Sequence, residues 1–268
     1  MKYKAIALDM DGTLLNTEHK LTTKTRDALL QAQEAGVKVI LASGRPDFGM
    51  MTVAKELRLK DYGGIVSSFN GGKVIDMQSN EVINENALTI KDCHELYDFS
   101  RICQIGLMTY NENSIITEDC DKYTKLEFQS CEIPFKKVDN FKESVANAPI
   151  KCLGTGDPEH IIEAAKKFQT KFNDRFSIFS SMPFFLEMTK KGVNKGVSLE
   201  QIAKYLNINL TEIIACGDGN NDLEMIKRAG LGVAMDNAND TIKAAADYIT
   251  TSNNDEGVTK IVNEFILN

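Results

Sequence analysis

The sequence lacks the features that would place the protein in or across a membrane. No stretch of its 268 residues approaches the apolar length of a membrane span. The N-terminus starts with basic residues, but the apolar run before the first aspartate is only about four residues long, too short for a secretion signal. We therefore expect a cytoplasmic protein with no membrane partner.

An excess of basic residues is also missing. The chain carries 31 lysines and arginines against 38 aspartates and glutamates, which gives a net charge of −7. A protein that binds the phosphate backbone of nucleic acids needs a basic face. The charge balance therefore argues against a nucleic-acid partner.

The sequence has no metal-ligand spacing of the kind that zinc sites show. Its six cysteines form no CxxC pair, so they predict free, mostly buried thiols in a reducing compartment. The three histidines are scattered beside no obvious nucleophile, and we expect surface or structural roles for His19, His94 and His160. A zinc site is therefore not indicated.

What the chain does contain is an alternation of short apolar strands and helices at both of its ends. Residues 1–82 and 192–268 show this βαβ pattern, which is typical of a parallel sheet. Residues 83–191 predict antiparallel strands and separate helices. We expect one α/β core built from both ends of the chain, with an inserted α+β domain.

The stretch ALDMDGTLLN ends the first predicted strand with two aspartates. Residues i and i+2 of a strand point to the same side, so Asp9 and Asp11 can face one pocket at the carboxyl end of the sheet. Carboxylates so close repel each other, and a positive group between them would remove this cost. The motif alone is also compatible with a simple turn.

The stretch GDGNND, residues 217–222, follows another apolar strand. It places Asp218 at the strand end and both Asn221 and Asp222 at the head of the next helix. Oxygen ligands in such a turn suit a hard cation. Asp222 by itself could equally be an ordinary N-cap.

Two further segments add groups that could bind phosphate. Ser43 and Gly44 end the second strand, and Lys195 precedes a helix, where an ammonium is unfavourable unless an anion faces it. Taken singly, these residues could form a turn and a surface lysine. Together the four segments supply a nucleophile, carboxylates for a divalent metal and positive donors, which is the set that phosphoryl transfer needs.

In their order, DMDGTLL, SGR, a lysine before a helix and GDGNND resemble the four signature motifs of the haloacid dehalogenase-like superfamily. The long insertion, with SMPFFLEMTKKGVNKG leading back to the core, resembles the Cof-type branch of sugar and small-molecule phosphatases. The resemblance covers the whole chain. It implies an α/β fold in which a parallel-sheet, Rossmann-like hydrolase core carries an inserted α+β cap domain.

The resemblance also implies a role for each motif residue. Asp9 would be the nucleophile that takes the phosphoryl group, and Asp11 would be the general acid and base. Mg²⁺ would be held by Asp9, the main-chain carbonyl of Asp11, and Asp218, with Asp222 as a close partner. The residues that would hold the phosphate are Ser43, Gly44, Lys195, Asn221 and the amide of Met10.

Three expectations concern the surroundings of these motifs. Asp11 must be protonated during part of the cycle, so we expect a raised pKa or an uptake of a proton with the substrate. Arg45 and Asn70 are expected to contact the leaving group. Phe184 and Phe185 are expected in the core of the cap rather than at the substrate.

The expected function is Mg²⁺-dependent hydrolysis of small phosphate monoesters: sugar phosphates, and also nucleotide or cofactor phosphates. Two alternatives remain open, a sugar-phosphate mutase and a non-catalytic phospho-acceptor or binding module. The first usually carries a smaller insertion just after the first motif, and the second is much shorter. The expected partner is a small phosphorylated metabolite, and the protein is expected to be a monomer or a weak homo-oligomer.

Overall fold

The computed structural model describes residues 2–111, 114–131 and 134–268. The chain divides into two compact units. The core unit comprises the chain up to Asn84 together with Asn194–Asn268, and the inserted unit comprises Glu85–Val193. The expected boundaries, after residues 82 and 191, fall two residues before these transitions.

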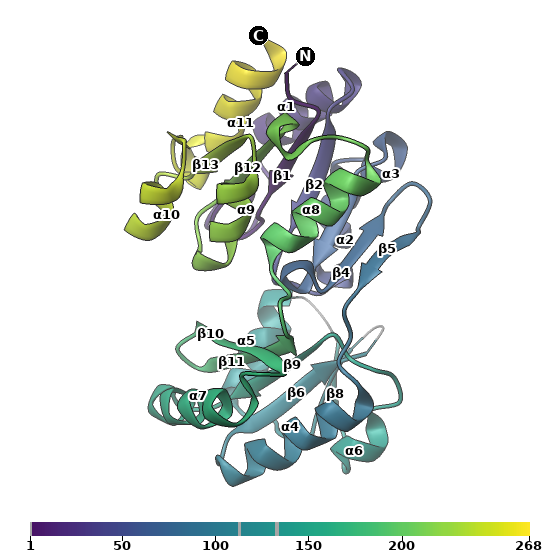
Figure 1. Cartoon of the computed structure of the whole chain (residues 1–268), viewed down its shortest axis with the longest axis vertical. Helices are drawn as coiled ribbons and strands as arrows, with labels where there is room; N and C mark the ends of the chain where they lie inside the picture. Colours follow the sequence, from purple (N-terminus) through teal and green to yellow (C-terminus); the bar gives the residue numbers. More distant parts are fainter. Residues whose placement is uncertain (1, 112–113, 132–133) are drawn as a thin grey trace. The chain divides into compact units, whose positions relative to one another are not determined.

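The core unit is built on an eight-stranded sheet in the order β14-β13-β12-β1-β2-β3-β4-β5 (Figure 1). β1 pairs in parallel with β12 on one side and with β2 on the other, whereas β4 is antiparallel to β3. The parallel pairing follows from the βαβ pattern. The strands are β1 Ala5–Leu8, β2 Lys38–Ala42, β3 Ile65–Ser68, β4 Lys73–Asp76, β5 Val82–Glu85, β12 Ile213–Gly217, β13 Leu231–Ala234 and β14 Tyr248–Ile249.

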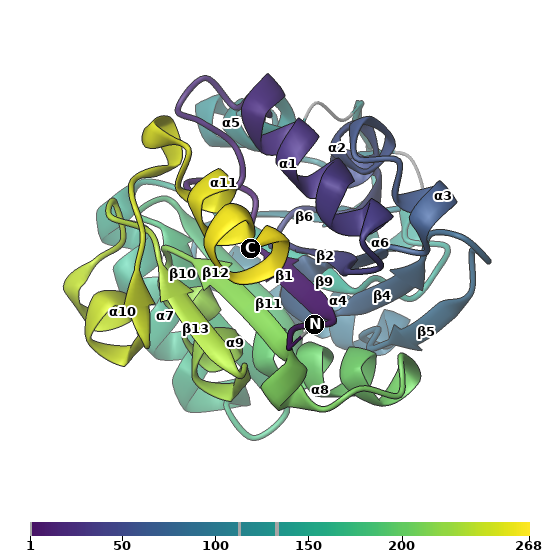
Figure 2. The same cartoon turned by 90° about the horizontal axis from the view of Figure 1, so that it is seen from above.

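Helices cover both faces of the core sheet, because the parallel strands are buried on both sides. Ile6 and Leu8 of β1 share a hydrophobic cluster with α1 and α11, whereas Ala5 and Ala7 pack with α8 and α9 on the other face (Figure 2). The helices of this unit are α1 Thr23–Glu34, α2 Met51–Glu56, α3 Leu59–Tyr62, α8 Lys195–Tyr205, α9 Leu223–Arg228, α10 Asp240–Ala245 and α11 Gly257–Val262.

Short turns of helix join these elements. Most are 3₁₀ turns, which are common as connectors. They are η1 Asp47–Met50, η2 Phe69–Gly71, η3 Leu210–Glu212, η4 Asn220–Asp222 and η5 Asn253–Asp255, and a π-helical turn η6, Asn263–Leu267, follows α11. Two of them contain predicted site residues: η2, after β3, contains Asn70, and η4, after β12, contains Asn221 and Asp222.

The inserted unit is built on a six-stranded sheet in the order β10-β11-β9-β6-β7-β8. Its neighbours run antiparallel except β7 and β8, which are parallel. The strands are β6 Gly106–Tyr110, β7 Ile115–Thr117, β8 Phe135–Lys137, β9 Lys151–Thr155, β10 Phe176–Met182 and β11 Phe185–Lys190. The antiparallel α+β character agrees with the pattern of the sequence.

One face of this second sheet is covered by α4 (Ile90–Ile102) and α7 (Pro158–Phe172), whose apolar sides share one cluster with β6, β9 and β11. A capping box starts α4, in which the Thr89 side chain accepts from the Asp92 amide and the Asp92 carboxylate accepts from the Thr89 amide. Two further helices, α5 (Lys122–Cys131) and α6 (Phe141–Ser144), lie in a segment for which no element was predicted.

Two expectations from the sequence, free cysteines and the lack of a membrane span, can be compared with the structure. The cysteines with described side chains are free thiols, all of them buried except Cys120; the side chain of Cys131 lies outside the described part. Among the described residues, no helix combines the length and the apolar character needed to cross a membrane.

Candidate active site

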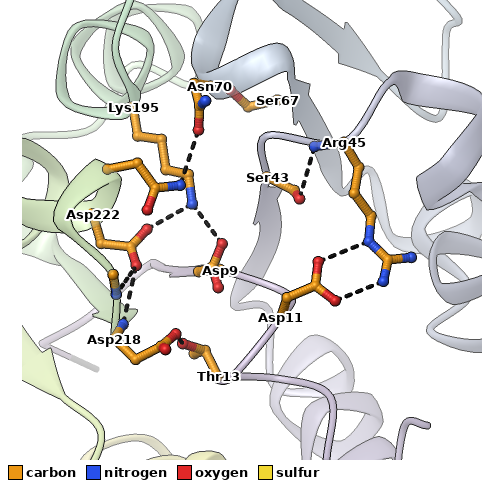
Figure 3. A network of polar contacts seen from close by, with 12 residues as sticks. Asp9, Asp11, Thr13, Ser43, Arg45, Ser67, Asn70, Lys195, Asp218 and Asp222 are labelled. Atoms are coloured by element: carbon orange, nitrogen blue, oxygen red, sulfur yellow. Dashed lines mark hydrogen bonds and ion pairs between the residues drawn. The ribbon is translucent and has the colours of Figure 1, made fainter. Parts of the chain in front are cut away.

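The predicted site residues of the core unit lie in loops at the carboxyl ends of β1, β2, β3 and β12, and at the start of α8 (Figure 3). These four strands are consecutive neighbours in the sheet. In a parallel sheet, their carboxyl ends meet at one edge. Residues more than 200 positions apart in the chain can therefore share one polar network.

The loop after β1 approaches the loop after β12 very closely. Gly12 has a φ of +82°, and a Cβ at this position would stand only 2.4 Å from Oδ2 of Asp218. A side chain here would therefore displace the Asp218 carboxylate, and the left-handed φ would strain its own backbone. The hydroxyl of Thr13 donates to Oδ1 of Asp218 at 2.8 Å and ties the loops together.

A buried lysine joins two of the predicted carboxylates. Nζ of Lys195 donates to Oδ1 of Asp9 at 2.5 Å and to Oδ1 of Asp222 at 2.6 Å (Figure 3). The exposed fractions are 1% for Lys195, 6% for Asp9 and 0% for Asp222. Lys195 is the first residue of α8, where an ammonium opposes the helix dipole. The two carboxylates offset this cost.

The charges in this cluster shift one another's pKa values. Burial acts to lower the pKa of Lys195, but the charges of Asp222 and Asp9 raise it above its ordinary value. Burial and the neighbouring charge of Asp222 raise the pKa of Asp9 well above its usual range, against the opposing effect of Lys195. The lysine alone therefore does not neutralise the negative charge around it.

Asp9, Asp218 and Asp222 form a group of carboxylates able to hold a metal ion. One oxygen of each lies within 4.8 Å of the others. Burial above all raises the pKa of Asp218 to about 6, and the Thr13 hydroxyl opposes this shift. Oδ2 of Asp222 already accepts from the amides of Asp218 (3.0 Å) and Gly219 (2.9 Å), so this side chain also fixes the loop after β12.

Asp11 lies apart from that lysine and is bound by an arginine. Nε and Nη2 of Arg45 donate to its two oxygens at 2.8 and 2.6 Å (Figure 3). Nδ1 of His19 lies 3.2 Å from Oδ1 of the same carboxylate. Burial acts to raise the pKa of Asp11, but the hydrogen bonds and charge of Arg45, with His19, hold it below its ordinary value. The expected raised pKa is therefore wrong for this arrangement. The alternative, an uptake of a proton with the substrate, stays a prediction.

The residues predicted to hold phosphate surround this network. The Ser43 hydroxyl, 2% exposed, accepts from the amide of Arg45 at 3.1 Å. The side chain of Met10 is completely buried in the core under α1, so only its main chain is available to a ligand. The side chain of Asn221 donates to Oδ1 of Asn70 at 3.0 Å, which joins the loops after β12 and β3.

Three residues of the site were not predicted. Thr13 lies within the first motif, DMDGTLL, but no role was assigned to it, although its place after Gly12 could have indicated one. His19 lies at the surface, as expected, but no contact with the site was predicted; a loop with His19 at a φ of 56° brings its ring to Asp11. Nδ2 of Asn237 donates to the carbonyl of Gly12 at 2.7 Å from the segment after β13, and no motif marks it.

A comparison with known proteins leads to the same family as the motifs do. The sequence model of the haloacid dehalogenase-like hydrolases matches residues 6–262. The chain belongs to this family. It is 35% identical to the putative phosphatase YxeH of Bacillus subtilis, over 99% of both chains.

Solved structures of haloacid dehalogenase-like hydrolases share the fold. The structure of such a hydrolase from Bacteroides thetaiotaomicron superposes with a TM-score of 0.94 at 37% identity and covers 97% of this chain and 98% of that one. A structure described as a subclass IIB sugar phosphatase of the superfamily gives a TM-score of 0.81 at 26% identity, over 98% of both chains.

These likenesses confirm the resemblance that the motifs indicated and the expected fold class, an α/β core with a parallel-rich sheet. The chain is therefore an enzyme, and the expected class, a hydrolase of phosphoric monoesters, is confirmed at the level of the family.

Proposed function

We propose that the protein is a Mg²⁺-dependent phosphatase that hydrolyses small phosphate monoesters, sugar phosphates among them, through an aspartyl-phosphate on Asp9. The observation that carries this proposal is the cluster in which Lys195 joins buried Asp9 to Asp222, with an oxygen of Asp218 within 4.8 Å of both carboxylates. The likeness to the subclass IIB sugar phosphatase, at 26% identity, supports the substrate class.

The donor set fits a magnesium ion. Mg²⁺ prefers carboxylate and carbonyl oxygens, and three carboxylates here present oxygens within 4.8 Å of one another. Burial, with the nearby charge of Asp222, raises the pKa values of Asp9 and Asp218, and a bound cation would favour their ionised forms. Asp9, Asp218 and the main-chain carbonyl of Asp11 would hold the ion. Asp222 is a weaker candidate ligand, because both of its oxygens already accept hydrogen bonds.

When bound, the ion supplies the charge that lets a carboxylate approach an anionic phosphate. An oxygen of Asp9 forms a bond to phosphorus, the ester P–O bond breaks, and Asp11, which takes up a proton as the substrate binds, gives that proton to the departing alcohol. Water then attacks phosphorus while Asp11 takes up the proton of that water, and the bond between Asp9 and phosphorus breaks. Inorganic phosphate leaves, and both carboxyl groups return to their initial state.

The other predicted residues act on the phosphate oxygens. The proposed donors to these oxygens are Lys195, the Ser43 hydroxyl, the main-chain amides of Gly44 and Met10, and the side-chain amide of Asn221. Such donors stabilise the charge of the phosphoryl group during transfer. Arg45, which holds Asp11 from the side of the second motif, is proposed to contact the leaving group as well.

Further parts of the proposal concern the cellular setting. We propose that the enzyme acts in the cytoplasm on small phosphorylated metabolites, as a monomer or a weak homo-oligomer. A partner among nucleic acids is not proposed, and the net charge of −7 supports this. A membrane partner is not proposed either.

The experiment that tests the proposal is the release of inorganic phosphate from a panel of esters. The panel holds sugar phosphates, nucleotides and p-nitrophenyl phosphate, and each is measured with Mg²⁺ and with chelator. We expect release that requires Mg²⁺ and that is highest in kcat/KM for a sugar phosphate. Full release in chelator would overturn the magnesium assignment, and a nucleotide at the top of the ranking would overturn the substrate class.

A further inference from the structure

The segment after β3 has an unusual backbone. Phe69, Asn70 and Gly71 follow one another with φ values of 51°, 56° and 93°. Non-glycine residues avoid this left-handed region, and two of them in succession are costly because Cβ crowds the following carbonyl. Such a conformation persists only where its surroundings impose it, and it often marks a functional site.

The surroundings that hold this segment are the predicted phosphate loops. The amide of Asn70 donates to the carbonyl of Ser43 at 2.8 Å, and the amide of Phe69 donates to the carbonyl of Arg45 at 2.9 Å. On the other side, a Cβ on Gly71 would lie 2.8 Å from the carbonyl oxygen of Asn194, just before Lys195. The segment is therefore fixed between the end of β2 and the start of α8.

The conformation aims one polar side chain at the site. The side chain of Asn70 is 6% exposed, and its Oδ1 accepts from Nδ2 of Asn221 at 3.0 Å (Figure 3). Its own Nδ2 lies beside Gly44, where an added Cβ would approach it to 3.2 Å. β1 and β2 stand between β12 and β3 in the sheet, so this hydrogen bond spans the ends of the two strands that carry Asp9 and Ser43.

We propose that Asn70 is a positioning residue for the phosphate group, which acts by holding the amide of Asn221, and that it does not choose the leaving group. This inference rests on the proposed phosphatase function. An Asn221 side chain left without this acceptor would rotate among several rotamers, and its donors would no longer be preorganised for phosphate oxygens.

The test compares glycine substitutions at two asparagines with the same backbone conformation. Asn70→Gly removes the side chain, and glycine tolerates the left-handed φ at no steric cost. Asn80→Gly makes the same change at a φ of 59° in an exposed turn of the same unit, outside the site. We expect Asn70→Gly to weaken the binding of inorganic phosphate with Mg²⁺, measured by calorimetry, by about tenfold, the size of one hydrogen bond, and Asn80→Gly to leave it unchanged.

A double-mutant cycle decides whether Asn70 acts through Asn221. The Asn221→Ala variant should bind phosphate more weakly, and adding Asn70→Gly to it should cause no further loss. The fall in kcat/KM of Asn70→Gly should be the same for every ester that the wild type hydrolyses. Melting temperatures of both glycine variants should be similar.

Several results would overturn the inference. Multiplying effects in the double variant would show that Asn70 acts independently of Asn221. A changed ranking of esters with unchanged phosphate affinity would make it a leaving-group selector, and a lower melting temperature with unchanged phosphate affinity would make it merely structural. If the wild type binds phosphate but hydrolyses no ester, the proposed function fails, and the phosphate affinities still decide the role of Asn70. A wild type that binds no phosphate overturns both.

Discussion

Among the residues that the structure describes, each unit buries one lysine, and the two lysines have different surroundings. Lys195 of the core unit is 1% exposed and has two carboxylates within 2.6 Å, with Asp218 nearby. Lys151 of the inserted unit is 2% exposed, and it lies 3.6 Å from Glu187 and over the ring of Tyr110.

The two sites differ in whether several carboxylates are grouped at the buried ammonium. The cluster of the core unit sets three carboxylates around one ammonium, so it retains negative charge and has a use for a divalent cation. Lys151 lies 3.6 Å from Glu187, and no comparable group of three carboxylates is found at it among the described residues. Burial of a lysine is therefore no sign of catalysis by itself, whereas an excess of buried carboxylates around it is one.

The largest expected effect comes from removing the nucleophile. Asp9→Asn should lower kcat by about 10⁴-fold or more, because the amide cannot attack phosphorus. The matched change in the other lysine pair, Glu187→Gln, should lower kcat less than about tenfold. Phosphate release under Mg²⁺ measures both. Residual activity of Asp9→Asn near that of the wild type would contradict the covalent mechanism. An equal loss in Glu187→Gln would show that the two buried lysine sites do not differ in their importance for catalysis.

The next effect concerns stability. Lys195→Met leaves Asp9 and Asp222 facing each other in a buried site, and it should lower the free energy of unfolding by about 3–5 kcal/mol in metal-free buffer. Lys151→Met removes an ammonium that lies farther from its carboxylate, 3.6 Å from Glu187, and should cost less, about 1–3 kcal/mol. Urea titrations followed by circular dichroism compare the two. Equal losses would mean that the short contacts of Lys195 with two carboxylates add nothing to stability.

A smaller effect separates two aspartates that are bound alike. Asp11 in the core unit and Asp119 in the inserted unit each accept two hydrogen bonds from one arginine, Arg45 and Arg101 respectively. Asp11→Asn should slow the release of alkyl alcohols by about 100-fold and that of p-nitrophenol much less, because a poor leaving group needs the acid. Asp119→Asn should change neither. Equal slowing for aryl and alkyl esters would count against the acid role.

The smallest effect is expected at acid pH and tests whether the units unfold separately. Threonine hydroxyls donate to Glu256 in the core unit and to Asp92 in the inserted unit. Burial acts to raise both pKa values, but the hydroxyls outweigh it and lower them, together with Arg175 for Asp92. Each group therefore adds stability that is present above its ordinary pKa (4.5 and 3.8) and is lost as pH falls through the lowered value.

Calorimetry between pH 3 and 6 measures this loss. In Glu256→Gln, acid should lower the melting transition of the core unit less steeply than in the wild type. In Asp92→Asn, the same should hold for the transition of the inserted unit. A single transition that responds equally to both substitutions would show that the two units unfold as one.

Sequence patterns were most informative where contiguous residues determine the structure. The two motifs with aspartates follow strands whose apolar runs are unambiguous, and a parallel sheet then brings their ends together. Residues that reach the site through loops were missed. His19 and Asn237 contact the first motif only because of loop conformations that no local pattern specifies.

Side-chain partners were harder to anticipate than backbone positions. The pKa of Asp11 was expected to rise because its role in catalysis requires a proton, but the Arg45 guanidinium in this structure lowers it. Asn70 was expected near the leaving group because it follows a strand and precedes two glycines. Its contact with Asn221 depends on the left-handed backbone of the segment, which the sequence marks only as a turn.

The placement of β1 between β2 and β12 has a consequence for synthesis on the ribosome. Ala5 pairs with Ile213, so β1 waits for a neighbour that is made more than 200 residues later. At roughly 5–20 residues per second this delay is about 10–40 seconds, during which the hydrogen-bonding edge of β1 is open. The inserted unit is continuous in sequence, from Glu85 to Val193, and all of its strands leave the ribosome before β12 does. A nascent chain has therefore completed its inserted unit while the sheet of the core unit still lacks β12. During this time the open edge of β1 can mispair or aggregate.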